Sequence, residues 1–287
     1  MKFRFIQEHR ETFRVGSMCR VLKVSRSGYY AWCRRQPSER TREDARLADQ
    51  IREVHEGSRE TYGSPRVWRA LRRRGEIVGR HRVARIMRWE GIRGCAKQRF
   101  RRTATVRSEM PAAPNLVQGR FEADRPNALW LADVTQVRTR EGWLYLAMLL
   151  DVFSRKIVGF STAPHARQEL ALEALRAALE NRRPAPGLVH HSDRGSPYLS
   201  AEYQDQLDAH GALCSMSRPY RSVDNAMAES FFHTLKTEWL YHFDFYTREE
   251  ARLAIFDYIE IFYNRNRMHS AIDYRSPEEY EKLSAAA

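Results

Sequence analysis

The chain lacks the long apolar runs that would place it in or across a membrane. Its longest such run, residues 144–150, falls far short of the roughly 20 residues that a membrane helix needs, and Asp151 ends it. Near the N-terminus, Lys2 and Arg4 interrupt the apolar residues, so no signal-peptide core is formed. We therefore expect a cytoplasmic protein with no membrane partner.

Cysteine is scarce and follows no pattern. The four cysteines form no CxxC pair and show no zinc-ligand spacing. This excludes a disulfide framework and a zinc module, and it predicts reduced thiols. The residues are Cys19, Cys33, Cys95 and Cys214.

Acidic residues are few in the first part of the chain. Residues 1–125 hold 31 Lys and Arg against 14 Asp and Glu, whereas residues 126–287 hold 18 against 22. The net charge of +13 indicates a polyanionic partner. The imbalance favours a basic DNA-binding part joined to an acid-lined catalytic part over the alternative of a solubilising arginine surface.

Residues 1–96 are predicted to form a basic helical region of helix-turn-helix type. Residues 13–36 have the spacing of two short helices around a turn. In a second pair, Ser64 is expected to cap a helix that Pro65 opens, and residues 80–90 form the next helix.

Arginines on the helix at residues 80–90 lie away from its apolar stripe and can face phosphates. Their acidic neighbours in the sequence are few, which favours DNA contact over a solvated face of a packed helical unit. The residues predicted to contact DNA in this region are Arg26, Tyr29, Tyr30, Arg66, Arg80, Arg82 and Arg85.

Residues 97–127 lose periodicity and contain three prolines, which predicts a linker. Residues 128–287 then show strand-like and helical segments in the order of a mixed α/β sheet. The predicted strands are 129–137, 143–152 and 156–161 in an antiparallel meander, followed by 188–191 and 213–216; the predicted helices are 168–181, one after an N-cap at Ser200, and 224–241.

Three acidic residues lie at positions where a fold of this kind can carry catalytic side chains. Asp133 is in the middle of the first strand, Asp193 follows the fourth strand, and Glu229 is on what we predict to be the final helix. A carboxylate among apolar neighbours needs a cation or strong hydrogen bonds. Oxygen ligands select Mg²⁺ or Mn²⁺, and two such ions can drive an in-line phosphoryl displacement. Each acid alone could instead be a structural or solvated residue.

The long helix supports grouping these residues. Asn225, Glu229 and Lys236 share one helical face, with Lys236 about 10 Å from Glu229 along the axis. Asn225 and Lys236 are therefore predicted DNA contacts, and a solvated face with a charge pair is the alternative. The pair His190-His191 points to opposite faces of a strand, so we interpret both residues as structural.

Three short motifs contain the three acids, namely WLADVT at 130–135, HSDRGS at 191–196 and DNAMAES at 224–230, and 35 residues separate Asp193 from Glu229. These motifs resemble those of the DDE transposase and retroviral-integrase superfamily, with its D,D(35)E spacing.

Further motifs are DVFSR at 151–155, SMSR at 215–218, Phe231-Phe232, LKTE at 235–238, Tyr263-Asn264 with Arg267, His269 and Ser276-Pro277, and the N-terminal stretch 18–30. With them, the resemblance is closest to the second-frame (OrfB-type) transposases of bacterial insertion sequences that use ribosomal frameshifting.

This resemblance implies an RNase H-like core in which Asp133, Asp193 and Glu229 bind two Mg²⁺ or Mn²⁺ ions. It implies nicking at the ends of the element and attack by the freed 3′-hydroxyl on another phosphodiester, without a covalent enzyme intermediate. The implied partners are the insertion-sequence ends, the target DNA, an upstream-frame OrfA product or a fusion with it, and further copies of this chain. The implied location is the bacterial nucleoid.

Two other functions are compatible with parts of the sequence. A non-transposing RNase H-like nuclease would not need the basic first half of the chain. A DNA-binding regulator with an inert catalytic half would not need three acids at this spacing. Retroviral integrases usually carry a His/His/Cys/Cys zinc module, and no such spacing occurs here.

Overall fold

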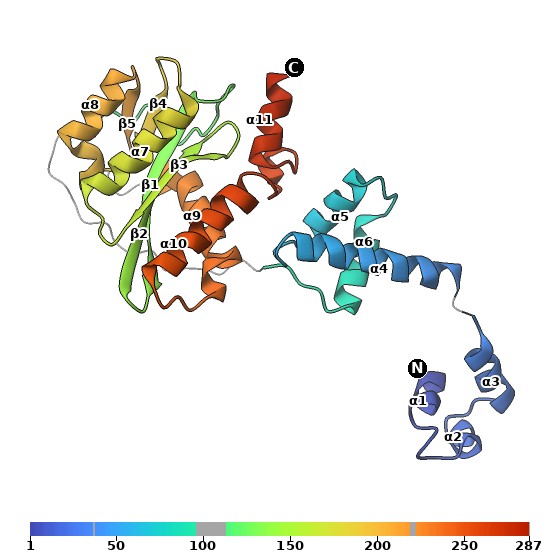
Figure 1. Cartoon of the computed structure of the whole chain (residues 1–287). Coiled ribbons are helices and arrows are strands. Elements are labelled where there is room, and N and C mark those ends of the chain that lie inside the picture. The colour runs from blue at the N-terminus through green and yellow to red at the C-terminus, as the bar shows by residue number, and fades with distance from the viewer. Residues whose placement is uncertain (37, 96–112, 219–221, 287) are drawn as a thin grey trace.

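A computed structural model describes residues 1–36, 38–95, 113–218 and 222–286. Residues 97–112 of the predicted linker lie outside these ranges. No helix in the described ranges is both long enough and apolar enough to cross a membrane. Figure 1 shows the first three helices standing apart from the rest of the chain.

The first three helices enclose a small core of their own. They are α1 (Lys2–Glu8), α2 (Val15–Val21) and α3 (Arg26–Arg34), and the last two confirm the helix pair predicted at residues 13–36. Ser25 caps α3, since its side chain accepts a hydrogen bond from the Gly28 amide at 3.0 Å. The buried residues of this core are Ile6, Met18, Cys19 and Tyr29.

A second helical unit consists of α4 (Glu39–Gly57), α5 (Ser64–Arg73) and α6 (Arg80–Trp89). Helices α5 and α6 confirm the second predicted pair. The prediction that Ser64 is the N-cap is wrong, because Gly63 holds that position and Ser64 is already helical.

Helix α4 was not predicted, although its apolar residues follow helical spacing from an N-cap at Ser38. Its buried Leu47 and Ile51 belong to a hydrophobic cluster that continues into the second half of the chain, where it includes Phe231. The predicted helical region therefore contains two separate hydrophobic clusters.

The second half is built on a five-stranded sheet with strand order β3-β2-β1-β4-β5. Strands β1 (Leu129–Thr139), β2 (Gly142–Asp151) and β3 (Ile157–Ala163) pair antiparallel, as the predicted meander requires. Strands β4 (Val189–Ser192) and β5 (Leu213–Met216) extend the sheet in parallel with β1. The predicted mixed α/β sheet is confirmed.

Helices cover both faces of this sheet (Figure 1). Helices α7 (Gln168–Arg182) and α8 (Ala201–Ala209) pack in one hydrophobic cluster with Trp130 and Ala132. Helices α9 (Ala226–Glu238) and α10 (Arg248–Phe256) pack in the other with Leu129 and Leu131. Successive β1 residues thus alternate between the two faces.

Further helices follow α9, in agreement with the C-terminal helices predicted for residues 128–287, so the prediction that Glu229 lies on the final helix is wrong. After α10, a π-helical segment (Asp257–Tyr263) and α11 (Pro277–Ala285) complete the chain. The second part of the predicted linker also contacts the sheet, because the Leu116 amide donates to the Ser215 hydroxyl at 2.9 Å.

Helix α7 packs so closely on β3 that only glycine fits at position 159. A Cβ atom there would lie 2.5 Å from the Ala174 carbonyl oxygen and 2.7 Å from the Ala178 Cβ. We expect Gly159→Ala to lower the free energy of unfolding by about 1–3 kcal/mol, as overpacking generally does. Urea denaturation measures this change.

Gly57→Ala is the matched control, since no atom lies within 4 Å of a Cβ built at that helical position. It should change stability by less than about 1 kcal/mol, in the stabilising direction. Equal effects of the two substitutions would contradict the close packing of α7 on β3.

Candidate active site

Asp133 lies in the middle of β1, on the face that α9 covers. It follows Leu129 and Leu131 at intervals of two residues, and both leucines belong to the α9 cluster. One carboxylate oxygen of Asp133 accepts a hydrogen bond from the Val134 amide at 2.8 Å. The strand period therefore directs this carboxylate towards α9.

Asp193 follows the last residue of β4. Strands β4 and β1 run parallel with His191 opposite Leu131, so the same register continued by two residues brings Asp193 alongside Asp133. Its side chain accepts a hydrogen bond from the Gly195 amide at 2.9 Å. A Cβ at position 195 would lie 2.9 Å from the same carboxylate oxygen, which explains the glycine in this turn.

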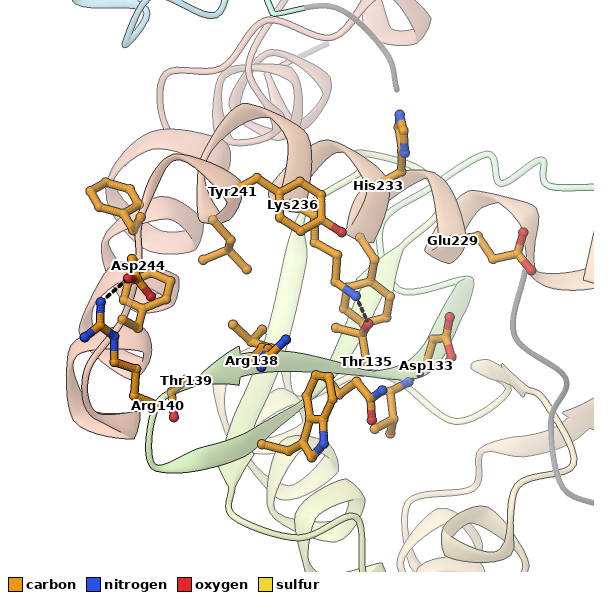
Figure 2. A pocket seen from close by; sticks show the side chains of 18 residues that line it. Asp133, Thr135, Arg138, Thr139, Arg140, Glu229, His233, Lys236, Tyr241 and Asp244 are labelled. Atoms are coloured by element: carbon orange, nitrogen blue, oxygen red, sulfur yellow. Dashed lines mark hydrogen bonds and ion pairs between the residues drawn. The ribbon is translucent and has the colours of Figure 1, made fainter. Parts of the chain in front are cut away.

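Glu229 lies in the first turn of α9. Asp133 and Glu229 line one groove of about 1050 Å³ between β1 and α9. Figure 2 shows their side chains at the same end of this groove. The structure thus brings Asp133 together with Glu229 in the groove and with Asp193 along the sheet.

Electrostatic effects connect the three acids. Burial, then the charge of Asp193 and, more weakly, that of Glu229 raise the pKa of Asp133 to about 8. Burial also raises the pKa of Asp193, against the hydrogen bond from Gly195. An array of carboxylates that oppose each other's ionisation has the charge and the oxygen ligands that suit a hard divalent cation. Within the described ranges, no three His, Cys, Asp or Glu side chains are already close enough together to hold one.

Asp224 anchors the start of α9. Its buried carboxylate accepts hydrogen bonds from the Arg218 backbone and guanidinium at 2.9–3.0 Å and from the Asn115 amide at 2.8 Å. The hydrogen bonds from Arg218 lower the pKa of Asp224 to about 2. Arg218, although part of the SMSR motif, and Asn115 were not predicted as partners of Asp224, because tertiary packing brings them together.

Asn225 holds the N-cap position of α9 and is buried. Its side-chain amide donates to the Ala132 carbonyl at 3.2 Å, next to Asp133. Asn225 thus precedes the first residue of α9, and its side chain lies towards β1, beside Asp133; contact of Asn225 with DNA stays a prediction.

The two adjacent histidines have separate structural partners, as predicted. His190 contacts the Tyr203 hydroxyl at 2.8 Å, whereas His191 contacts the Ser215 hydroxyl at 2.8 Å. Burial, followed by the charge of His191, lowers the pKa of His190 to about 3. His190 is therefore neutral, and its side chain lies on the α8 side of β4, the strand that leads to Asp193.

Lys236 reaches into the groove from α9. Its ammonium donates to the Thr135 hydroxyl at 2.7 Å, which the dashed line in Figure 2 marks. Burial lowers the pKa of Lys236, and the charge of Asp133 opposes this effect. The remaining lining includes groups that the sequence analysis missed, namely Arg138, Arg140, Trp143, Tyr241 and Phe243.

Two of the arginines predicted to contact DNA are neutralised within the protein. Arg82 and Arg85 bind Asp44 of α4 at 2.8 and 2.7 Å, and Arg82 also binds Glu43 at 3.0 Å. The few acidic residues expected near this helix include Glu43 and Asp44, which the unpredicted α4 brings against Arg82 and Arg85.

The other predicted contacts differ in exposure. Tyr29 is buried, and its hydroxyl donates to Gln7 at 2.6 Å, so this side chain belongs to the core of α1–α3. Arg26, Tyr30 and Arg80 are exposed and stay predictions. Arg66 lies against the end of α9, 3.5 Å from Glu238.

Comparison with known families matches most of the chain. Residues 123–222 and residues 229–284 match two models that are each described as an integrase core domain. Residues 41–100 match a model of an HTH-like domain. The first segment contains the sheet. The second covers most of α9 and the helices that follow it, and the third covers most of α4 together with α5 and α6.

Similarity to individual proteins extends over the full length. Transposase InsF for insertion sequence IS3A of Escherichia coli (strain K12) is 40% identical over 288 residues, covering 100% of both chains. The insertion element IS600 uncharacterized 31 kDa protein of Shigella sonnei is 44% identical over 272 residues, covering 93% of this chain and 100% of that protein.

Solved structures resemble the chain more distantly. The simian T-cell lymphotropic virus intasome with PP2A regulatory subunit B56 gamma has 16% identity and a TM-score of 0.48, covering 80% of this chain and 74% of that chain. The HTLV-2 integrase catalytic core domain in complex with magnesium has 16% identity and a TM-score of 0.44, covering 56% of this chain and 99% of that chain.

Repulsion among the closely spaced acids predicts how the stability of the metal-free protein depends on pH. Because the pKa of Asp133 is raised to about 8, the folded state binds a proton more tightly than the unfolded state, and stability falls as pH rises from about 4 to 8. In EDTA at pH 8, we expect Asp133→Asn to melt above the wild type, by about 2–4 °C for each kcal/mol of relieved repulsion.

Differential scanning fluorimetry across this pH range tests the prediction. Asp205→Asn, at an exposed position of α8, is the control and should melt like the wild type. Added Mg²⁺ should raise the melting temperature of the wild type more than that of Asp133→Asn. A variant that melts below the wild type at pH 8 in EDTA would refute the repulsion.

Proposed function

Because this chain belongs to the family of insertion-sequence transposases with an integrase core domain, we propose that Asp133, Asp193 and Glu229 carry its chemistry. The chain is a DDE-type transposase, which cuts and joins DNA during transposition. The observation that carries the assignment is the convergence of the three acids: Asp133 and Glu229 line one groove, and Asp193 raises the pKa of Asp133.

We propose that the three carboxylates hold Mg²⁺ or Mn²⁺, as two ions. When bound, such ions activate the attacking oxygen and stabilise the leaving oxygen of the phosphodiester. The support from this chain is its donor set, which is made of carboxylate oxygens that repel one another when no cation is present. Two hydrogen bonds fix the surroundings of these acids: the Asn225 amide binds the Ala132 carbonyl at the start of α9, and the Gly195 amide binds the side chain of Asp193.

The rest of the groove suits a DNA strand. Lys236 and Arg138 supply positive charge near the acids, which can bind backbone phosphates. Trp143, Tyr241 and Phe243 are 44%, 51% and 44% exposed, and exposed rings of this kind can stack with bases. We propose that the groove holds the DNA end that is cut.

We further propose that the transposase acts as an oligomer on DNA, together with the upstream-frame OrfA product or fused to it. Joining an element to its target involves two element ends, and each end needs an active site. The HTH-like helices α4–α6 supply a DNA-binding unit, and OrfA would supply the specific reading of the terminal repeats. Such an assembly would work at the bacterial nucleoid in the cytoplasm.

Substitution of each acid tests the assignment. We expect Asp133→Asn, Asp193→Asn and Glu229→Gln to reduce Mg²⁺-dependent cleavage of element ends by about 10²–10³-fold, since each removes a carboxylate that would hold the ions that stabilise the transition state. DNA affinity should stay within about twofold of the wild type. Cleavage is measured on labelled donor DNA, and affinity is measured by fluorescence anisotropy in EDTA.

The matched controls are Asp205→Asn and Glu173→Gln, at exposed positions of α8 and α7. They should cleave like the wild type. If all three triad variants still nick the donor, the assignment is wrong. Parallel reactions with and without the OrfA product show whether this chain needs it, and formation of joined products separates a transposase from a plain nuclease.

A further inference from the structure

A second pocket lies along α9, next to the groove that holds Asp133 and Glu229. Its volume is about 240 Å³, and its walls come from α5, α9, the turn between β2 and β3, and the segment after the π-helix. His233 lines both cavities, so the pocket and the groove meet along the same helix.

Positive charge dominates this pocket. Three arginines line it, namely Arg66, Arg155 and Arg267, against the single carboxylate of Glu238. The guanidinium of Arg267 donates a hydrogen bond to each of the two carboxylate oxygens of Glu238, both at 2.6 Å. The guanidinium of Arg66 lies 3.5 Å from the same carboxylate. The pocket therefore carries an excess of positive charge.

Arg155 is the cation without a counter-ion. Among the described residues, its guanidinium has no hydrogen-bond or ion-pair partner, although burial lowers its pKa. Its backbone is in the left-handed region with φ of 67°, a conformation that glycine would adopt at lower cost. An arginine held here, partly desolvated and unpaired, indicates a missing anion.

Two further groups support an anion in the pocket. The hydroxyl oxygen of Thr237 on α9 is buried and has no hydrogen-bond partner among the described residues. His269 lines the same pocket as the three arginines, and burial, then the charges of Arg267, Arg66 and Arg155 lower its pKa, so a neutral His269 brings no negative charge to offset them. A phosphate oxygen could accept hydrogen bonds from both the arginines and the threonine.

We propose that this pocket binds a backbone phosphate of the DNA strand that runs through the catalytic groove. Glu229 and Thr237 are eight residues apart on α9, about 12 Å along the helix axis. At about 3.4 Å of axial rise per nucleotide, the bound phosphate lies roughly three or four nucleotides from the one that is cut. The inference rests on the proposed function, because it assumes that the groove holds the cut strand.

Binding measured without chemistry tests the site. In EDTA, Arg155→Gln should bind a short fluorescein-labelled duplex roughly tenfold more weakly at 0.1 M salt, and the slope of log Kd against log salt should fall by about 1. Arg155→Lys keeps the charge and should recover most of the affinity. Arg176→Gln, on α7 across the sheet, removes an arginine outside the pocket and should bind nearly like the wild type.

Folding is checked by circular dichroism and melting temperature for every variant. If Arg155→Gln is folded and keeps the affinity and salt slope of the wild type, the proposal is overturned. Inorganic phosphate is titrated separately by thermal shift. If it stabilises the wild type but not Arg155→Gln, while the DNA affinities are equal, the pocket is a small-anion site and the DNA proposal also fails.

The same experiments separate this inference from the proposed function. Asp133→Asn should bind DNA like the wild type and lose cleavage, whereas Arg155→Gln should lose affinity with the three acids intact. Loss of cleavage in the acid variants with normal binding by Arg155→Gln overturns only the phosphate pocket. Active acid variants would refute the triad, whatever Arg155→Gln shows.

Discussion

The proposed active site depends on how firmly α9 is held across the sheet, because Asp133 and Glu229 repel each other when both are ionised. Ionic contacts hold both ends of this helix. Before its first turn, Asp224 binds Arg218 and Asn115, and at its last residue Glu238 binds the guanidinium of Arg267. Burial alone would raise the pKa of Glu238, but the hydrogen bonds from Arg267 lower it. Removing one partner of such a buried pair typically costs about 3–5 kcal/mol.

The same end of α9 connects the helical unit α4–α6 to the catalytic core. Arg66 of α5 approaches Glu238, and the Tyr62 hydroxyl accepts a hydrogen bond from the Met268 amide at 2.7 Å. Arg59 binds Asp257 at 2.6 Å and lies 4.4 Å from the centre of the Trp239 ring. The unit α4–α6 is therefore bound directly to the end of the helix that carries Glu229.

Local patterns predicted the sheet and the position of Asp133, because strand alternation and an acid among apolar residues are visible in the sequence. Contacts between distant segments were not visible. The charges of Arg82 and Arg85 looked available for DNA, since Asp44 lies about 40 positions earlier and meets them only after α4 packs on α6. The start of the long helix was also not visible, since a 3-10 segment over Ser222–Asn225 precedes α9 and makes Asn225 its N-cap.

The motif that contains Asn264 and Arg267 shows how residues far from the three acids can still fix the geometry of the proposed site. The side chain of Asn264 pairs with the backbone of Ile157 through contacts of 2.9 and 3.0 Å, so it occupies the hydrogen-bonding groups at the start of the edge strand β3. Arg267, three residues later, binds the end of α9. One short segment thus ties the sheet edge to α9. By binding both, this segment helps to fix the position of Glu229 relative to Asp133. The proposed site needs that fixed geometry, and the three acids cannot supply it themselves because they repel one another.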